Sequence, residues 1–178
     1  MKVLILTGSA KRKGTSALLA EEYQRGAEEV GHVVEIFRAG TGKVHGCTGC
    51  NHCEYGKNSC VFRDDMDVLN PKLLEADVIV IASPIYYWGI SSQLKAVIDR
   101  WQPTVFAMQG HKKVVLLTTQ ASDEDWVTEP VDAWYKALLR FMKWENGGRL
   151  AAKGVPARAD IEAADYPQQA YALGKELH

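Results

Sequence analysis

The chain opens with Val3-Leu4-Ile5-Leu6-Thr7, continues through Gly8-Ser9-Ala10-Lys11-Arg12-Lys13-Gly14-Thr15-Ser16, and then reads Ala17-Leu18-Leu19-Ala20. The apolar run predicts a buried strand, the small and hydroxyl residues predict a loop, and the last segment predicts the start of a helix. Backbone N–H groups and the positive end of the helix dipole attract a phosphate at such a junction. The opening stretch therefore predicts a strand, a phosphate-binding loop and a helix.

This loop differs from the two most familiar phosphate motifs. It lacks the Lys-Ser/Thr pair of the Walker pattern and the Gly-x-Gly-x-x-Gly spacing of the dinucleotide fingerprint. The hydroxyls of Ser9, Thr15 and Ser16, with close backbone approach at Gly14, suit the single phosphate of a mononucleotide. The alternative is an ordinary helix start in which Thr15 or Ser16 is the N-cap.

Composition limits the class of protein. The chain has 178 residues, 47% of them hydrophobic, and a formal net charge of -1, which predicts one domain over residues 1–178 with a full core. The near-neutral charge argues against nucleic acid or an anionic membrane as a partner. The start does not resemble a secretory signal, and no apolar stretch approaches the roughly 20 residues of a membrane helix. We therefore expect a cytoplasmic protein.

Strand and helix patterns alternate along the rest of the chain, which predicts a doubly wound α/β fold around a five-stranded parallel sheet. The segment after Asp77 is continuously apolar, as in a strand covered on both faces, and is expected to end at Ser83-Pro84. The predicted strands are 3–7, 33–37, 77–82, 113–119 and about 148–155. The predicted helices are about 15–30, 66–75, 91–101, 129–143 and 163–177.

Ligands of such sheets bind outside the carboxyl ends of the strands, where the strand order switches. Three loops are expected to converge there: residues 8–16, 83–90 and 118–123. The second loop carries Tyr86, Tyr87 and Trp88, which favour a planar ring beside the phosphate loop. These aromatic residues could instead anchor the core or a subunit interface.

Four cysteines are clustered in one loop, as Cys47-x2-Cys50-x2-Cys53-x6-Cys60. Four thiolates so close in sequence could hold a [4Fe-4S] cluster. Three alternatives remain: a four-cysteine zinc site, a redox-active cysteine pair, and reduced thiols packed in a folded loop.

Two further segments are expected to be structural. Asp64-Asp65, just before Met66, is interpreted as a cap that favours the helix dipole rather than as a metal pair. The segment Leu94-Lys95-x-x-Ile98-Asp99-Arg100 is predicted to be a packed helix with a solvated ion-pair face.

These motifs, taken in order, resemble the flavodoxin-fold NAD(P)H-dependent FMN reductases, and most closely the branch that contains the iron-sulfur flavoproteins. The resemblance rests on Gly8 to Ser16, the cysteine loop leading to Asp64-Asp65-Met66, Ala76-Asp77 leading to Ser83-Pro84-Ile85-Tyr86, and residues 94–100. It implies a three-layer flavodoxin-like fold. It fades beyond Thr119, where such families commonly carry a glycine-rich turn and this chain has Thr118 to Asp123.

The resemblance implies noncovalently bound FMN that takes hydride from NAD(P)H and passes electrons to a small acceptor such as a quinone or free flavin. It also implies a homodimer or homotetramer. No catalytic acid or base is assigned, because the flavin carries the chemistry. The implied FMN-binding residues are Ser9, Lys11, Gly14, Thr15, Ser16, Pro84, Ile85, Tyr86, Tyr87, Trp88, Gly89, Thr118, Thr119 and Gln120, and the implied cluster ligands are Cys47, Cys50, Cys53 and Cys60.

The function predicted first is that of an FMN-dependent NAD(P)H oxidoreductase. The alternative is an iron-sulfur flavoprotein that passes electrons between FMN, a [4Fe-4S] cluster and a partner protein. The basic residues Lys11, Arg12 and Lys13 favour NADPH over NADH. A flavin-binding regulator is a remoter interpretation, because the chain has no DNA-binding motif.

Overall fold

The computed structural model describes the backbone of residues 1–178 and every side chain except that of Tyr55. Five parallel strands form a sheet in the order β2-β1-β3-β5-β6, and the two-residue β4 pairs antiparallel with the end of β3. The predicted five-stranded parallel sheet is confirmed. The strands are β1 (Lys2–Thr7), β2 (Val33–Phe37), β3 (Val78–Tyr86), β4 (Gly89–Ile90), β5 (Lys113–Thr119) and β6 (Glu145–Ala152).

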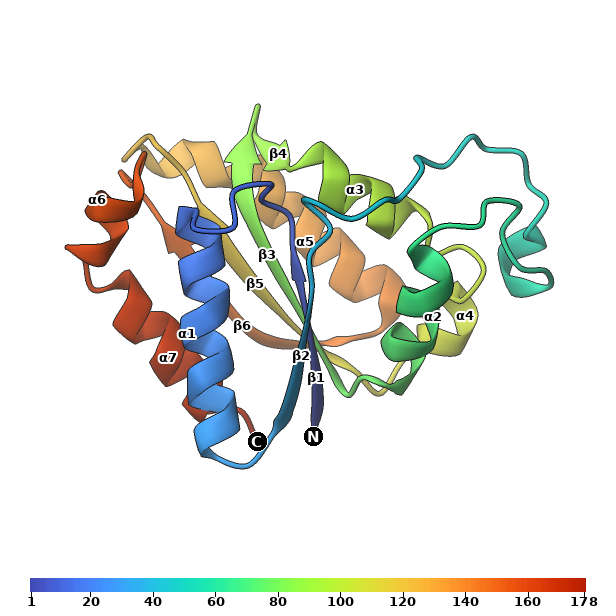
Figure 1. Cartoon of the computed structure of the whole chain (residues 1–178), viewed down its shortest axis with the longest axis horizontal. Helices are drawn as coiled ribbons and strands as arrows, with labels where there is room; N and C mark the ends of the chain where they lie inside the picture. The colour runs from blue at the N-terminus through green and yellow to red at the C-terminus, as the bar shows by residue number, and fades with distance from the viewer.

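Helices cover both faces of the sheet, as a doubly wound fold requires. Figure 1 shows α1, α6 and α7 on one side and α2, α3, α4 and α5 on the other. None of the helices in the described chain combines the length and apolar character needed to cross a bilayer. The α-helices are α1 (Thr15–Glu29), α2 (Met66–Glu75), α3 (Ser92–Asp99), α4 (Val105–Met108), α5 (Glu129–Met142), α6 (Arg158–Glu162) and α7 (Tyr166–Lys175), and the 3-10 turns are η1 (Glu54–Gly56) and η2 (Asp125–Thr128).

Alternation along the strands builds two cores. In β1, Leu4 and Leu6 face the core shared with α2 to α5, whereas Val3 and Ile5 face the core shared with α1, α6 and α7. Successive side chains of a strand point to opposite faces, so an all-apolar central strand fills both layers. This packing fixes the carboxyl ends of β1, β3 and β5 side by side.

Three predicted boundaries were wrong. Strand β3 does not end at Ser83-Pro84 but continues to Tyr86 and turns back into β4. The last strand lies at Glu145–Ala152 rather than 148–155. The last helix, predicted at 163–177, is α7 at Tyr166–Lys175, where Pro167 in the first turn favours the start, and the short α6 before it was not predicted.

Helices α1 and α7 approach each other through two glycines. A Cβ at Gly26 would clash with the carbonyl oxygen of Tyr171, and a Cβ at Gly174 would clash with that of Tyr23. Both obstacles are backbone atoms of the facing helix, so they cannot move aside as a flexible side chain can. The two helices therefore pack backbone to backbone.

We expect Gly174→Ala to destabilise the protein, although alanine is the better helix former. The gain in helix propensity is about 1 kcal/mol, and overpacking costs about 1–3 kcal/mol, with backbone clashes at the upper end. The net loss of unfolding free energy, about 1–2 kcal/mol, is measured by urea denaturation. Gln168→Ala, on the exposed face of the same helix, is the control and should be neutral or stabilising. Equal unfolding free energies for the two variants would mean that α1 and α7 can move apart to make room for the added Cβ atom.

Candidate functional site

A cleft of about 440 Å³, here called the phosphate-loop pocket, opens at the carboxyl ends of β1, β3 and β5. It brings together nine of the residues predicted to bind FMN: Ser9, Lys11, Gly14, Thr15, Pro84, Ile85, Tyr86, Thr119 and Gln120. The pocket lies within the usual size range of small-molecule sites, about 300–1,000 Å³. The structure therefore brings these nine residues together in one cleft at the edge of the sheet where ligands of doubly wound folds bind.

The phosphate loop is a compact turn. The backbone N–H of Lys11 donates to Ser9 Oγ at 3.1 Å, and the N–H of Gly14 donates to the carbonyl of Lys11 at 3.0 Å. Helix α1 begins after Gly14, which is the N-cap and makes no side-chain capping bond. Neither Thr15 nor Ser16 is therefore the N-cap of this helix. The first-turn N–H groups of a helix have no acceptor inside that helix, so they are free for an anion.

The hydroxyls of Thr15 and Ser16 have different surroundings. Thr15 lines the pocket, and its Oγ1 donates to Thr119 Oγ1 at 2.9 Å, which ties the first loop to the end of β5. Ser16 is buried and does not line the pocket, and its Oγ has no hydrogen-bond partner among the described residues.

Cationic side chains surround this pocket. Lys11 and Lys13 come from the phosphate loop, and Arg158 comes from the start of α6. The sequence analysis missed Arg158 and its neighbours Val155, Pro156 and Ala157, which follow the last strand. The carboxyl-end rule could have identified them, since β6 ends at the same edge of the sheet as β5. The charge suits an anionic group such as phosphate.

The turn between β3 and β4 presents aromatic side chains to solvent. Tyr87 and Trp88 both have positive φ, 46° and 60°, in a two-residue hairpin turn that usually takes Asn-Gly. Tyr87 is 94% exposed, and Trp88 lies 5.9 Å from Trp126, centroid to centroid. Tyr86, Tyr87 and Trp88 line a shallow hollow beside the phosphate-loop pocket, and Gly89 lines another with Trp88. Tyr87, Trp88 and Gly89, which were predicted to bind FMN, are thus at the mouth of the cleft rather than in it, whereas Tyr86 lines both.

The end of β5 supplies Thr119 to the pocket and the loop after it supplies Gln120 and Ala121, while Thr118 is buried outside the pocket. Gln120 is held by two bonds from its Nε2, to the carbonyls of Ser122 and Glu124, both at 3.0 Å. Its Oε1 is buried and accepts no bond from any described residue. A glycine-rich turn is therefore not needed for this loop to reach the cleft.

We expect Thr15→Val to weaken FMN binding. The change removes the hydroxyl that donates to Thr119 Oγ1, so the hydrogen bond that ties the phosphate loop to the end of β5 is lost. Losing such a bond costs about 1–3 kcal/mol, which is roughly 5- to 150-fold in Kd, measured by titrating flavin-free protein with FMN. Thr41→Val, at an exposed loop position outside the cleft, is the matched control. Equal Kd values for both variants would place the phosphate elsewhere.

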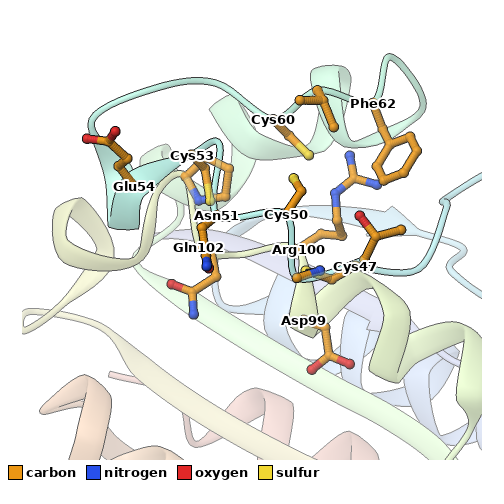
Figure 2. A pocket seen from close by; sticks show the side chains of 14 residues that line it. Cys47, Cys50, Asn51, Cys53, Glu54, Cys60, Phe62, Asp99, Arg100 and Gln102 are labelled. Atoms are coloured by element: carbon orange, nitrogen blue, oxygen red, sulfur yellow. The ribbon is translucent and has the colours of Figure 1, made fainter.

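The four cysteines line a second cavity, here called the cysteine pocket, of about 130 Å³. Figure 2 shows the sulfur atoms of Cys50 and Cys60 pointing toward each other, with Cys47 and Cys53 on other parts of the wall. The segment that carries them extends away from the sheet beside α2 and α4 (Figure 1). Within the residues that the structure describes, no three Cys, His, Asp or Glu side chains converge on the position of a single ion. The thiols are free and share one pocket.

An ion pair anchors this segment to α3. The guanidinium of Arg100, which is only 2% exposed, donates from Nη1 to Asp64 Oδ2 at 2.9 Å and from Nη2 to Asp64 Oδ1 at 3.2 Å. Nη1 also donates to the carbonyl of His45 at 2.8 Å. The predicted capping role of Asp64 holds in part, because its Oδ1 accepts the N–H of Met66 at 3.1 Å. The prediction of a solvated ion-pair face holds for Lys95 and Asp99 but was wrong for Arg100.

The pKa of Asp64 lies below its ordinary value of 3.8. Partial burial acts to raise this pKa, but hydrogen bonds from Arg100 and from the N–H groups of His45 and Met66, with the charge of Arg100, together lower it further. A carboxyl group with a lowered folded pKa adds stability above its unfolded pKa, and that stability is lost as the pH falls through the folded value.

Asp64→Ala is therefore expected to lower the unfolding free energy at pH 7 by about 3–5 kcal/mol, because it leaves Arg100 buried without its counter-ion. The difference in unfolding free energy between the variant and the wild type should become smaller as the pH falls below about 4. Urea denaturation at pH 7 and at pH 3 measures this difference at each pH. Asp132→Ala, which breaks a partly exposed pair with Arg149, is the control. A difference that does not change with pH would exclude the carboxylate as its cause.

Helix α3 connects the two pockets. At its N-terminus, Ser91 Oγ donates to the carbonyl of Gly8 at 2.8 Å, and the Ser91 N–H donates to Ser83 Oγ at 2.9 Å. At its C-terminus, Arg100 lines the cysteine pocket. The buried residues Ser91, Leu94, Val97 and Arg100 recur every third position. One short helix thus braces both the phosphate loop and the cysteine segment.

Among curated proteins, the chain is 37% identical over 115 residues to an iron-sulfur flavoprotein of Methanocaldococcus jannaschii, covering 64% of this chain and 58% of that protein. It is 36% identical over 103 residues to an iron-sulfur flavoprotein of Archaeoglobus fulgidus, covering 58% and 46%. The chain thus spans about half the length of the curated relatives it matches.

Among solved structures, the fold is similar to that of an NAD(P)H:quinone oxidoreductase from Methanothermobacter marburgensis. The TM-score is 0.78 at 19% identity, over 98% of this chain and 96% of that one. This likeness confirms the flavodoxin-like fold. The sequence pattern of the NADPH-dependent FMN reductases matches residues 1–139, more than three quarters of the chain. The chain belongs to the NADPH-dependent FMN reductase family.

Proposed function

We propose that this protein is an iron-sulfur flavoprotein that exchanges electrons between FMN in the phosphate-loop pocket and a [4Fe-4S] cluster in the cysteine pocket. The observation that carries the proposal is the placement of four free thiols around one cavity. The curated relatives described above, which are named iron-sulfur flavoproteins, support it. The proposal favours the alternative of the sequence analysis over a reductase of small acceptors without a cluster.

The phosphate-loop pocket fits FMN. Free N–H groups at the start of α1, the Thr15 hydroxyl and the cations Lys11, Lys13 and Arg158 match a terminal phosphate. Pro84, Ile85 and Tyr86 offer a wall for a flat ring, and the unpartnered Oε1 of Gln120 is an acceptor for a polar ring edge. FMN would supply hydride and electron transfer, while these residues bind it and orient its ring.

The cysteine pocket fits a cluster better than a single ion. Cys47, Cys50, Cys53 and Cys60 surround the cavity without converging on one point, and a cluster of four iron atoms separates its thiolate ligands more widely than one ion does. Phe62 and Pro103 contribute apolar wall. The cluster would supply one-electron transfer, while the protein holds the thiolates and limits the access of water.

The proposal includes a source and a destination for the electrons. NADPH is the reductant that the family name indicates. The exposed aromatic turn at Tyr87 and Trp88 leaves the mouth of the cleft open to a small acceptor, such as a quinone or free flavin, or to a partner protein. Association into a dimer or tetramer would cover this aromatic surface, as burial of large apolar side chains favours.

Purification without oxygen, followed by a visible spectrum and analysis for iron, zinc and acid-labile sulfide, tests this function. Flavin bands over a broad iron-sulfur absorption, with four iron and four sulfide for each chain, are expected for a single [4Fe-4S] cluster. Flavin bands alone, bleached by NADPH, would instead support a simple FMN reductase with reduced thiols. One zinc for each chain would assign the cysteines to a zinc site.

A further inference from the structure

Arg100 is a buried cation in the wall of the cysteine pocket. It follows directly after α3, is only 2% exposed, and lines the cavity together with all four cysteines. Figure 2 shows its side chain beside Cys50 and Cys60, with the Phe62 ring close to the guanidinium. The distance from Arg100 Cζ to the centre of that ring is 5.1 Å, within cation–π range. The guanidinium is thus fixed in place from two sides, by Asp64 and by Phe62.

The guanidinium has a donor that the protein leaves unused. Three N–H bonds go to Asp64 and to the carbonyl of His45, all from Nη1 and Nη2. The Nε atom is buried and has no hydrogen-bond partner in the described part of the chain. A buried donor without an acceptor is costly, and native structures rarely keep one without a reason. The occupant of the pocket is an acceptor that would satisfy it.

The charges of the residues that line the cysteine pocket also favour an anionic group there. Among the described side chains that line the pocket, Arg100 is the one cation, and Glu54 and Asp99 are the anions. These two anions pair with Lys57 and Lys95 at the surface. Four thiolates around a [4Fe-4S]2+ core carry a net charge of about −2, because four negative ligands outweigh two positive charges. A buried guanidinium edge is the complementary group for such a charge.

We propose that Arg100 donates its free Nε–H to a sulfur atom of the iron-sulfur group, and that this bond, together with the Asp64 counter-charge, sets the reduction potential of the group. The inference rests on the proposed function. Hydrogen bonds to sulfur and net charge are two of the factors that fix the potential of an iron-sulfur centre, because both stabilise the more negative, reduced form. Asp64 binds Nη1 and Nη2 of the guanidinium and so fixes the direction in which Nε points.

Two variants of the complete, anaerobically purified protein test this inference through the midpoint potential of the iron-sulfur absorption. Arg100→Lys keeps the charge but removes the Nε–H, so its midpoint potential should fall below that of wild type. Asp64→Asn keeps Arg100 but removes a negative charge beside it, so its potential should rise. Gln93→Ala, an exposed change on the same helix that lines neither pocket, is the control and should leave the potential unchanged. Iron, sulfide and FMN contents are measured on every sample.

The two variants are expected to shift the midpoint potential in opposite directions, and this distinguishes control of the potential by Arg100 from a merely structural role. If Arg100 only held the loop, both variants would lose iron and sulfide, and the molecules that remained loaded would show the wild-type potential, which overturns the inference. If Arg100→Lys fails to fold, as judged by its thermal melt and FMN content, a rise in Asp64→Asn supports the inference and no rise overturns it. Wild-type protein without iron and sulfide overturns the proposed function itself, and this inference with it.

Discussion

Cys50→Ser is expected to leave the protein without iron and sulfide while its FMN content stays at the wild-type level. Thiolates are the ligands that iron-sulfur clusters use, and a serine hydroxyl stays protonated at neutral pH and binds iron poorly. Cys50 is exposed and lines the cysteine pocket. It lies more than 20 residues away in sequence from both Ser16 and Pro84, the nearest of the residues predicted to bind FMN. The loss should therefore be confined to the cluster. Iron and sulfide analysis and flavin absorbance of the same anaerobic sample measure the two contents.

The control for this change is Thr48→Ser, which alters a non-cysteine residue of the same pocket. It should retain iron, sulfide and FMN. Full iron and sulfide in Cys50→Ser would contradict the four-cysteine ligand set. Loss of both FMN and iron in this variant would mean that the two pockets do not fold independently of each other.

Gly40→Ala is expected to lower the FMN content sharply through a residue that does not touch the cleft. A Cβ at Gly40 would clash with the carbonyl group of Ser9 and with the backbone nitrogen of Ala10, and the Gly40 N–H donates to the carbonyl of Thr7 at 3.0 Å. The phosphate loop must therefore move. Overpacking against backbone costs about 1–3 kcal/mol, which corresponds to roughly 5- to 150-fold weaker binding if the whole cost falls on the loop conformation that binds FMN.

The measurement is the Kd of FMN for the flavin-free protein. Gly46→Ala, the same change at a glycine whose Cβ would have no described atom within 4 Å, should bind FMN as wild type does. If both variants bind FMN equally, the loop from Gly8 to Ser16 is not the phosphate site.

Segments with strong local signals were predicted well from the sequence. The predicted helix 66–75 and strand 113–119 match α2 and β5 residue for residue. The continuous apolar runs of β1, β3 and β5 could only be satisfied by burial on both faces. Because strands and helices alternate along the chain, the edge of the sheet where the strand order switches could also be predicted. Most of the residues of the phosphate-loop pocket lie in the loops at that edge.

Long-range pairing decided the features that sequence reasoning missed. Arg100 follows an exposed Lys95–Asp99 pair and shares its helical pattern, so nothing local indicates that it is buried. Its partner Asp64 lies 36 positions earlier and reads as a helix cap. Likewise, the hairpin at Tyr87-Trp88 lacks the Asn and Gly that mark such a turn. Contacts with the rest of the fold hold Tyr87 and Trp88 in a backbone conformation that these residue types disfavour.

The three-residue recurrence in α3 has a consequence for how this protein can change. The structural contacts of the helix are made by Ser91, Leu94, Val97 and Arg100, whereas Ser92, Gln93 and Lys95 face solvent. The distance between the two ends is set by the backbone rise of about 1.5 Å per residue, which exposed side chains do not alter. The outer face of α3 is therefore open to mutational drift in charge and size, while the spacing of the two pockets stays constant.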